Sequence, residues 1–93
     1  MKIKAKNNFY YLGKTYQNCF FYCRIDQYFD TNTSTIECLM YNDENKYNMN
    51  YPYIYSFGIS ISNDIIDNEN LIFEQINDFF KSISPNVILE LIN

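Results

Sequence analysis

Residues 53–62 read YIYSFGISIS, and this stretch decides the fold class. It alternates between two sets of side chains, Tyr53, Tyr55, Phe57, Ile59 and Ile61 in one and Ile54, Ser56, Gly58, Ser60 and Ser62 in the other. A period of two is that of a β-strand with one face in the core. Pro52 has no backbone N–H for a sheet ladder, so we expect it at the start of the strand or at an edge. The stretch predicts a strand over about residues 52–62.

Beyond residue 64 the apolar period changes from that of a strand to that of a helix. Five apolar residues follow at spacings of four, three, one and three: Ile72, Ile76, Phe79, Phe80 and Ile83. They share one face of an amphipathic helix, which we predict over residues 69–83. Asn68 suits the N-cap, and Lys81 complements the helix dipole in the last turn. After Pro85, the apolar tail 86–92 fits either a second short helix or a strand.

Three further strands are predicted on the N-terminal side. Ile3 and Ala5 alternate with lysines, and Gly13 supplies a tight turn, which predicts strands over about residues 2–11 and 16–28. A third is predicted over residues 33–41, and the polar residues 42–46 predict an exposed loop. We therefore expect one α+β domain over residues 1–93, an antiparallel meander of about four strands with helix 69–83 packed on one face.

The 93-residue chain has no histidine and a formal net charge of -4. Without imidazole, Ser/His and Cys/His nucleophile pairs, histidine general bases and the usual zinc sites are excluded. Neighbouring acids such as Asp43 and Glu44 lie in predicted turns, where carboxyl groups lack the burial that a general acid needs. Gly13 and Gly58 stand alone, so there is no glycine-rich phosphate loop. We expect no enzyme activity and no cofactor.

Three cysteines, Cys19, Cys23 and Cys38, are the nearest approach to a redox or metal motif. On an extended strand, four residues separate Cys19 from Cys23 by about 13 Å, too far for a disulfide or a shared ion. We interpret all three as buried small hydrophobic residues, in preference to reactive thiols or a metal site that includes Cys38. An odd number of thiols, with no signal-peptide pattern and no long apolar segment, indicates a cytoplasmic protein without a membrane partner.

Charge is unevenly distributed along the sequence. Residues 1–24 carry five cations and no acid, whereas residues 25–93 carry eleven acids against Lys46 and Lys81. Residue types with A/T-rich codons dominate, as expected for an A/T-rich bacterium, phage or mobile element. Lysine nevertheless occurs only six times against fourteen asparagines, although the codons of both are A-rich. This imbalance fits either chance in a short chain or pressure for an acidic surface.

Acids and tyrosines between residues 22 and 44 form the candidate partner-binding surface. Its members are Tyr22, Asp26, Tyr28, Asp30, Glu37, Tyr41, Asp43 and Glu44. Negative charge and aromatic rings together suit a basic groove on another protein, because both electrostatic steering and buried ring contacts are available. The competing interpretations are an ordinary solvated surface, or a sheet whose tyrosines and N-terminal lysines bind single-stranded nucleic acid. The net charge argues against direct nucleic-acid binding.

These observations lead to one functional hypothesis and one alternative. We expect a non-enzymatic acidic protein-binding module, an anti-CRISPR-like or other anti-defence inhibitor from a phage or mobile element. Its partner would be a basic surface on a host protein, such as the nucleic-acid-binding site of a nuclease. The alternative is a phage virion or assembly component that forms a homo-oligomer through its sheet edge.

Overall fold

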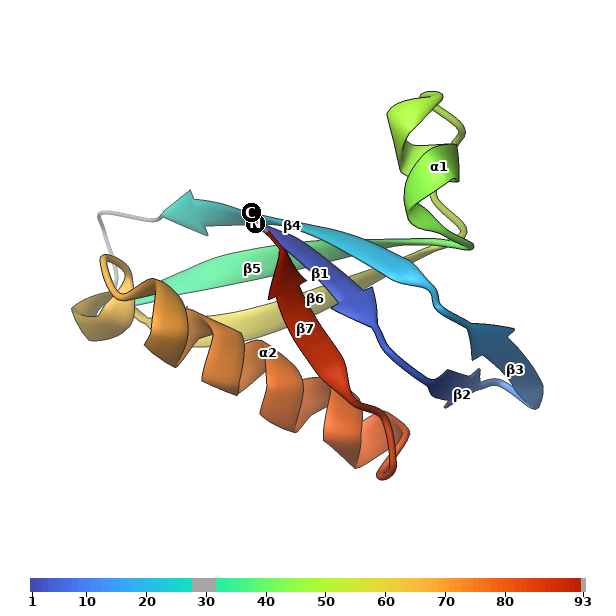
Figure 1. Ribbon diagram of the computed structural model, residues 1–93. Helices are drawn as coiled ribbons and strands as arrows, with labels where there is room; N and C mark the ends of the chain where they lie inside the picture. Colours follow the sequence, from blue (N-terminus) through green and yellow to red (C-terminus); the bar gives the residue numbers. More distant parts are fainter. Residues whose placement is uncertain (28–31, 93) are drawn as a thin grey trace.

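The protein forms an antiparallel sheet of five strands with one long helix laid across it. The strands of this sheet are β1 (Lys2–Ala5), β4 (Phe20–Gln27), β5 (Thr33–Tyr41), β6 (Tyr55–Ser62) and β7 (Leu89–Ile92). Their order across the sheet is β6-β5-β4-β1-β7, and helix α2 (Glu69–Ile83) covers one face (Figure 1). The computed structural model describes residues 1–27 and 32–92. The predicted α+β fold, with one helix on a mostly antiparallel sheet, is confirmed.

The prediction of single strands over residues 2–11 and 16–28 is wrong, because each is divided in two. Besides β1 and β4, the chain forms a separate hairpin of β2 (Asn8–Tyr11) and β3 (Lys14–Gln17). Asn18, at a φ of 54°, breaks the second strand. Asn7 breaks the first: its side chain donates to Asn86 O and accepts from Ile88 N, both at 2.8 Å. The described residues therefore contain seven strands in two sheets in place of about four.

Other predicted boundaries shift by smaller amounts. The strand predicted over residues 52–62 begins only at Tyr55, so Pro52 and Tyr53 precede it. The loop expected over residues 42–46 contains a short helix, α1 (Glu44–Asn48), which the Asp43 side chain caps by accepting from Lys46 N at 2.9 Å. The ambiguous tail forms a strand, β7, which pairs with β1.

Helix α2 is predicted correctly over residues 69–83, and its apolar face closes the main core. Ile72, Ile76 and Phe80 are buried against the sheet. The Phe80 ring lies 4.4 Å from Phe21 and 5.6 Å from Phe9, measured between centroids. Since Phe9 comes from β2, the hairpin closes one end of this core.

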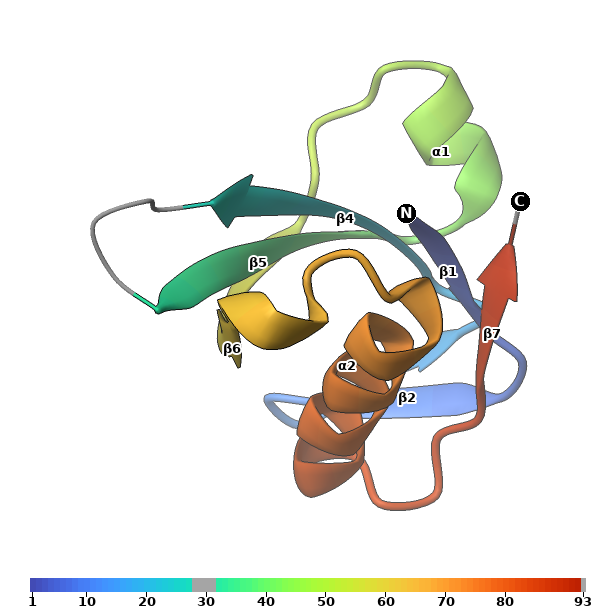
Figure 2. The same ribbon diagram turned by 90° about the vertical axis from the view of Figure 1, so that its left-hand side faces the viewer.

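Helix α1 lies on the side of the sheet opposite α2, as the two views show together (Figures 1 and 2). We call that side the outer face. A second, smaller buried cluster of Phe20, Leu39 and Tyr41 lies there. None of the helices in residues 1–27 and 32–92 is long and apolar enough to cross a membrane.

Candidate partner-binding surfaces

The outer face is built around the ring of Tyr47, which α1 places over the sheet. Strand register sets Lys2, Tyr22 and Leu39 side by side on this face. The Tyr47 ring contacts Phe20 at 4.9 Å and both Tyr22 and Tyr41 at 5.3 Å. Lys2 Nζ lies 5.7 Å from the same ring, a cation–π distance. The aromatic residues here pack mainly on one another.

Two members of the candidate surface are therefore largely covered. Tyr41 is only 9% exposed, and burial raises the pKa of its hydroxyl group. Tyr22 is half-buried beside Tyr47. Neither ring projects freely toward a partner.

Two acids of the outer face, Glu37 and Asp43, have a cationic or structural partner. Glu37 pairs with Arg24 at 2.7 Å. Because both side chains are partly exposed, this ion pair contributes at most about 1 kcal/mol, but it offsets the negative charge of Glu37. Asp26 lies opposite Thr35 in the β4–β5 register. Tyr28 and Asp30 lie outside the described residues.

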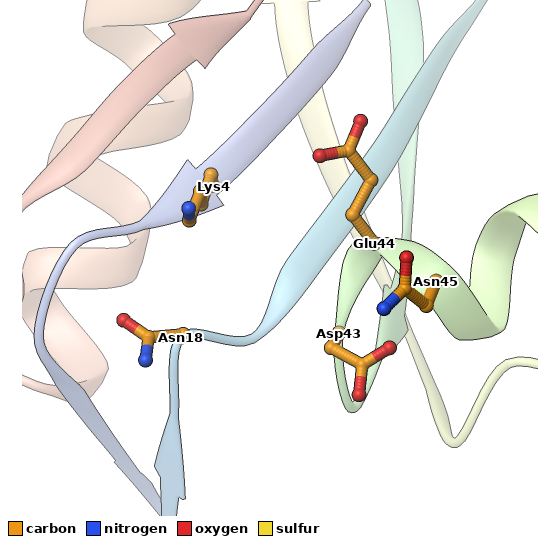
Figure 3. A pocket seen from close by; sticks show the side chains of 5 residues that line it. All are labelled: Lys4, Asn18, Asp43, Glu44 and Asn45. Carbon is orange, nitrogen blue, oxygen red and sulfur yellow. The ribbon is translucent and has the colours of Figure 1, made fainter.

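Asp43 and Glu44 line a small pocket at the start of α1. Figure 3 shows Lys4 and Asn18 on one side of it and Asp43, Glu44 and Asn45 on the other. Its volume is about 230 Å³, whereas small-molecule sites usually measure about 300–1,000 Å³. Since Asp43 already caps α1 and Lys4 lies across the pocket from the two acids, we assign this pocket no ligand.

The outer face as a whole is close to neutral. Its cations are Lys2, Lys4, Arg24 and Lys46, and its described acids are Asp26, Glu37, Asp43, Glu44 and Glu90. The strand order contributes to this balance, because it places Lys4 of β1 opposite Glu90 of β7 and Arg24 of β4 opposite Glu37 of β5. The sequence showed the acids but not these neighbours.

The negative charge is concentrated on the other side of the molecule, in a surface that the sequence analysis missed. The segment that runs from the 3₁₀ helix η1 (Asn63–Ile65) into α2 carries five exposed acids. We call these five residues, Asp64, Asp67, Glu69, Glu74 and Asp78, the acidic strip; within α2, Glu74 and Asp78 share one exposed side, and Glu69 lies in the first turn on another side. No lysine or arginine occurs between residues 47 and 80. A count of charge in short windows would have found this strip.

A second feature outside the candidate surface is an exposed apolar loop between α1 and β6. Met49, Tyr51, Tyr53 and Ile54 are 62%, 46%, 50% and 38% exposed. Residues 47–63 contain no charged side chain. Apolar and aromatic exposure without charge is typical of the centre of a protein interface.

No group of three or more His, Cys, Asp or Glu side chains in the described part of the chain could hold a metal ion. Comparison with family models, curated proteins and solved structures finds no match for the chain. The functional argument therefore depends on the chemistry of these surfaces.

Proposed function

We propose that the protein is a non-enzymatic protein-binding module that inhibits a nucleic-acid-binding protein by covering a basic site. The acidic strip supplies the binding surface. In this proposal the protein is encoded by a phage or mobile element and inhibits a defence protein of the host. The observation that carries the proposal is the concentration of charge. Residues 64–78 hold five acids and no base, and the rest of the chain has six acids against seven bases.

The positions of Glu74 and Asp78 support a binding role over a structural one, whereas Glu69, in the first turn of α2, complements the helix dipole. Glu74 and Asp78 are four residues apart on α2 and exposed, so their like charges cost the helix about 0.2–0.5 kcal/mol. A helix selected for stability alone would avoid this pairing. A negative strip instead accelerates encounter with a basic partner and orients it.

Leu71 gives the strip an apolar contact. It lies three residues before Glu74 and seven residues before Asp78, and these spacings place the three side chains on one side of the helix. Leu71 is 39% exposed, whereas the core-facing Ile72 is 2% exposed. An apolar side chain flanked by acids suits a basic groove with an apolar floor, where ring or aliphatic contacts add to electrostatic attraction.

The test is affinity capture from an extract of the native host at low and high salt, with mass spectrometry of the retained proteins. The variant Glu74→Gln/Asp78→Asn neutralises the strip, and Asp26→Asn/Glu90→Gln removes the same charge from the outer face. We expect the wild type and the outer-face variant to retain a basic protein, to release it as salt is raised, and to block its nucleic-acid binding. The strip variant should lose at least about tenfold in affinity. Equal capture by both variants, or capture indifferent to salt, would contradict the proposal.

A second candidate function is self-association through β6, and one observation favours it. β6 lies at one edge of the sheet, has eight residues and carries no charge, whereas the other edge, β7, has four residues and includes Glu90. Asn63 N donates to Asn32 O at 2.8 Å, so the backbone groups of Asn63 point toward the β5 side. Because successive residues of a strand direct their N–H and C=O groups to opposite sides, this bond fixes which residues of β6 face β5. Ser56, Gly58, Ser60 and Ser62 therefore direct their backbone groups away from β5. Natural edge strands usually carry a charge or a proline against such pairing.

Sedimentation equilibrium over a range of concentrations tests this candidate. Ser60→Pro removes an outward N–H without disturbing the ladder to β5, and Ser60→Ala is the matched control. We expect dimers or larger assemblies that persist in Ser60→Ala and dissociate in Ser60→Pro, with circular dichroism confirming that both variants fold. A protein that stays monomeric at all concentrations would exclude self-association, and the inhibitor function would be the remaining candidate.

A further inference from the structure

Cys23 and Cys38 lie directly opposite each other on neighbouring central strands. They are Cα partners in the β4–β5 register, and their Sγ atoms are 2.7 Å apart. A disulfide bond measures about 2.05 Å, so less than an ångström of movement separates the two thiols from covalent contact. Cys19, the third thiol, has no such partner among the described cysteines.

The backbone explains why these two sulfur atoms come so close. Cys23 N donates to Met1 O at 2.8 Å, and Cys23 O accepts from the N-terminal amine at 3.0 Å. Both backbone groups of Cys23 therefore point toward the N-terminal strand and away from β5. Cys23 and Cys38 consequently form a non-hydrogen-bonded pair, the type in which opposite side chains of an antiparallel sheet approach most closely.

The surroundings of the pair keep it reduced until an oxidant reaches it. Cys23 is 3% exposed and Cys38 is fully buried, both in the main core. The contact with Cys23, together with burial, raises the pKa of the Cys38 thiol. Because the thiolate is the reactive form, Cys38 suits the role of second, resolving thiol, and the more accessible Cys23 suits that of first attacker.

We propose that Cys23 and Cys38 form a two-thiol modification site that hydrogen peroxide closes to an intramolecular disulfide. In the first step the Cys23 sulfur attacks one peroxide oxygen, the O–O bond breaks, and Cys23 sulfenic acid and water form. In the second, the Cys38 sulfur attacks the Cys23 sulfur, the S–O bond breaks, and the Cys38 proton leaves with the hydroxyl group as water. Two thiols and one peroxide thus give one disulfide and two water molecules.

The expected consequence is a sheet that resists unfolding. The bond would join β4 to β5 and close a loop between positions 23 and 38, which restricts the unfolded chain. For a domain of this size, we expect the midpoint of thermal unfolding to rise by about 10 °C on oxidation and to return when dithiothreitol reduces the bond.

The full chain is treated with hydrogen peroxide, its remaining thiols are alkylated under denaturing conditions, and peptides are analysed without reduction. We expect a peptide pair joined through Cys23 and Cys38, a mass lower by two hydrogen atoms, and Cys19 alkylated. Cys19→Ser should behave like the wild type, whereas Cys23→Ala and Cys38→Ala should form no intramolecular bond.

Circular dichroism checks the folding of each variant, and the cross-linked peptide of the wild type supplies a result that needs no variant. Complete alkylation of all three thiols after prolonged exposure to peroxide would overturn the proposal. A bond that includes Cys19, or a bond formed only in chains first unfolded by urea, would also overturn it.

Discussion

At the scale of single residues, Tyr47 holds α1 on the sheet. Its ring contacts Phe20, Tyr22 and Tyr41 within 5.3 Å. We predict that Tyr47→Ala lowers the free energy of unfolding by about 1–3 kcal/mol, because it removes a half-buried ring from an aromatic cluster. Tyr53→Ala is the matched control: this ring is 50% exposed and should cost less than about 0.5 kcal/mol. Urea unfolding gives the free energy of unfolding of both variants, and an equal decrease in the two would contradict the role of Tyr47 in holding α1 on the sheet.

Cys19 makes stability depend on pH in the alkaline range. Burial raises the pKa of its thiol to about 12, from an ordinary value of 9.0. Between these values the unfolded chain has lost the proton that the folded chain keeps, so stability falls as pH rises. The slope for one such group approaches about 1.4 kcal/mol per pH unit.

We therefore predict that the wild type loses more stability between about pH 9 and 10.5 than Cys19→Ala does. Urea unfolding at each pH gives the slope of the unfolding free energy against pH for each protein. The smaller alanine side chain lowers the stability of the variant by an amount that does not depend on pH, so it does not change the comparison of slopes. Parallel slopes would show that the Cys19 thiol is not protected by burial.

At the scale of elements, the β2–β3 hairpin carries an unfavourable residue in its turn. Leu12 and Gly13 have φ values of 50° and 76°, a left-handed conformation that glycine and asparagine adopt more readily than leucine. We predict that Leu12→Asn stabilises the protein by about 0.5–1 kcal/mol and raises its thermal midpoint by a few degrees. Leu12→Ala keeps the cost of the left-handed backbone conformation, so it should not stabilise the protein. A lower midpoint for Leu12→Asn would mean that the Leu12 side chain itself stabilises the fold.

The elements differ in how well the sequence predicts them. Helix α2 and the interior of β6 follow from local periodicity, and Asn68 marks the start of α2 by accepting from Leu71 N at 3.1 Å. The break between β1 and β2 depends on Asn7, whose partners lie 79 and 81 positions away. Helix α1 likewise depends on ring contacts from β4 and β5. Such long-range contacts leave no local pattern in the sequence.

The candidate surface shows the same division between local and long-range information. The sequence identified acids and tyrosines individually, but their surroundings depend on the strand order. β1 sets Lys2 beside Tyr22 and Lys4 beside Phe20, and β5 sets Glu37 beside Arg24. The acidic strip, by contrast, lies within one short segment, residues 64–78, and needed only a local count of charge.

At the scale of the whole molecule, charge separates the two sides of the sheet. The outer face is nearly balanced, whereas the side covered by α2 carries the acidic strip. A basic partner would therefore meet the α2 side first, because electrostatic attraction orients the molecules before contact. The exposed apolar loop lies next to the start of β6 and has no charged side chain of its own, although Lys46 Nζ lies 4.4 Å from the centroid of the Tyr51 ring, so contacts there would depend less on salt than contacts with the acidic strip.

A stability measurement distinguishes an acidic strip kept for binding from one kept for folding. Glu74→Gln removes the like-charge pair with Asp78, so we predict that it stabilises the protein by a few tenths of a kcal/mol at low ionic strength. The gain should vanish in about 1 M salt, where charges farther apart than about 3 Å are screened. Glu90→Gln, which removes a carboxylate opposite Lys4, should give no such gain. If Glu74→Gln instead destabilises the fold, Glu74 has a structural partner, and the charge cost that supports a binding role is absent.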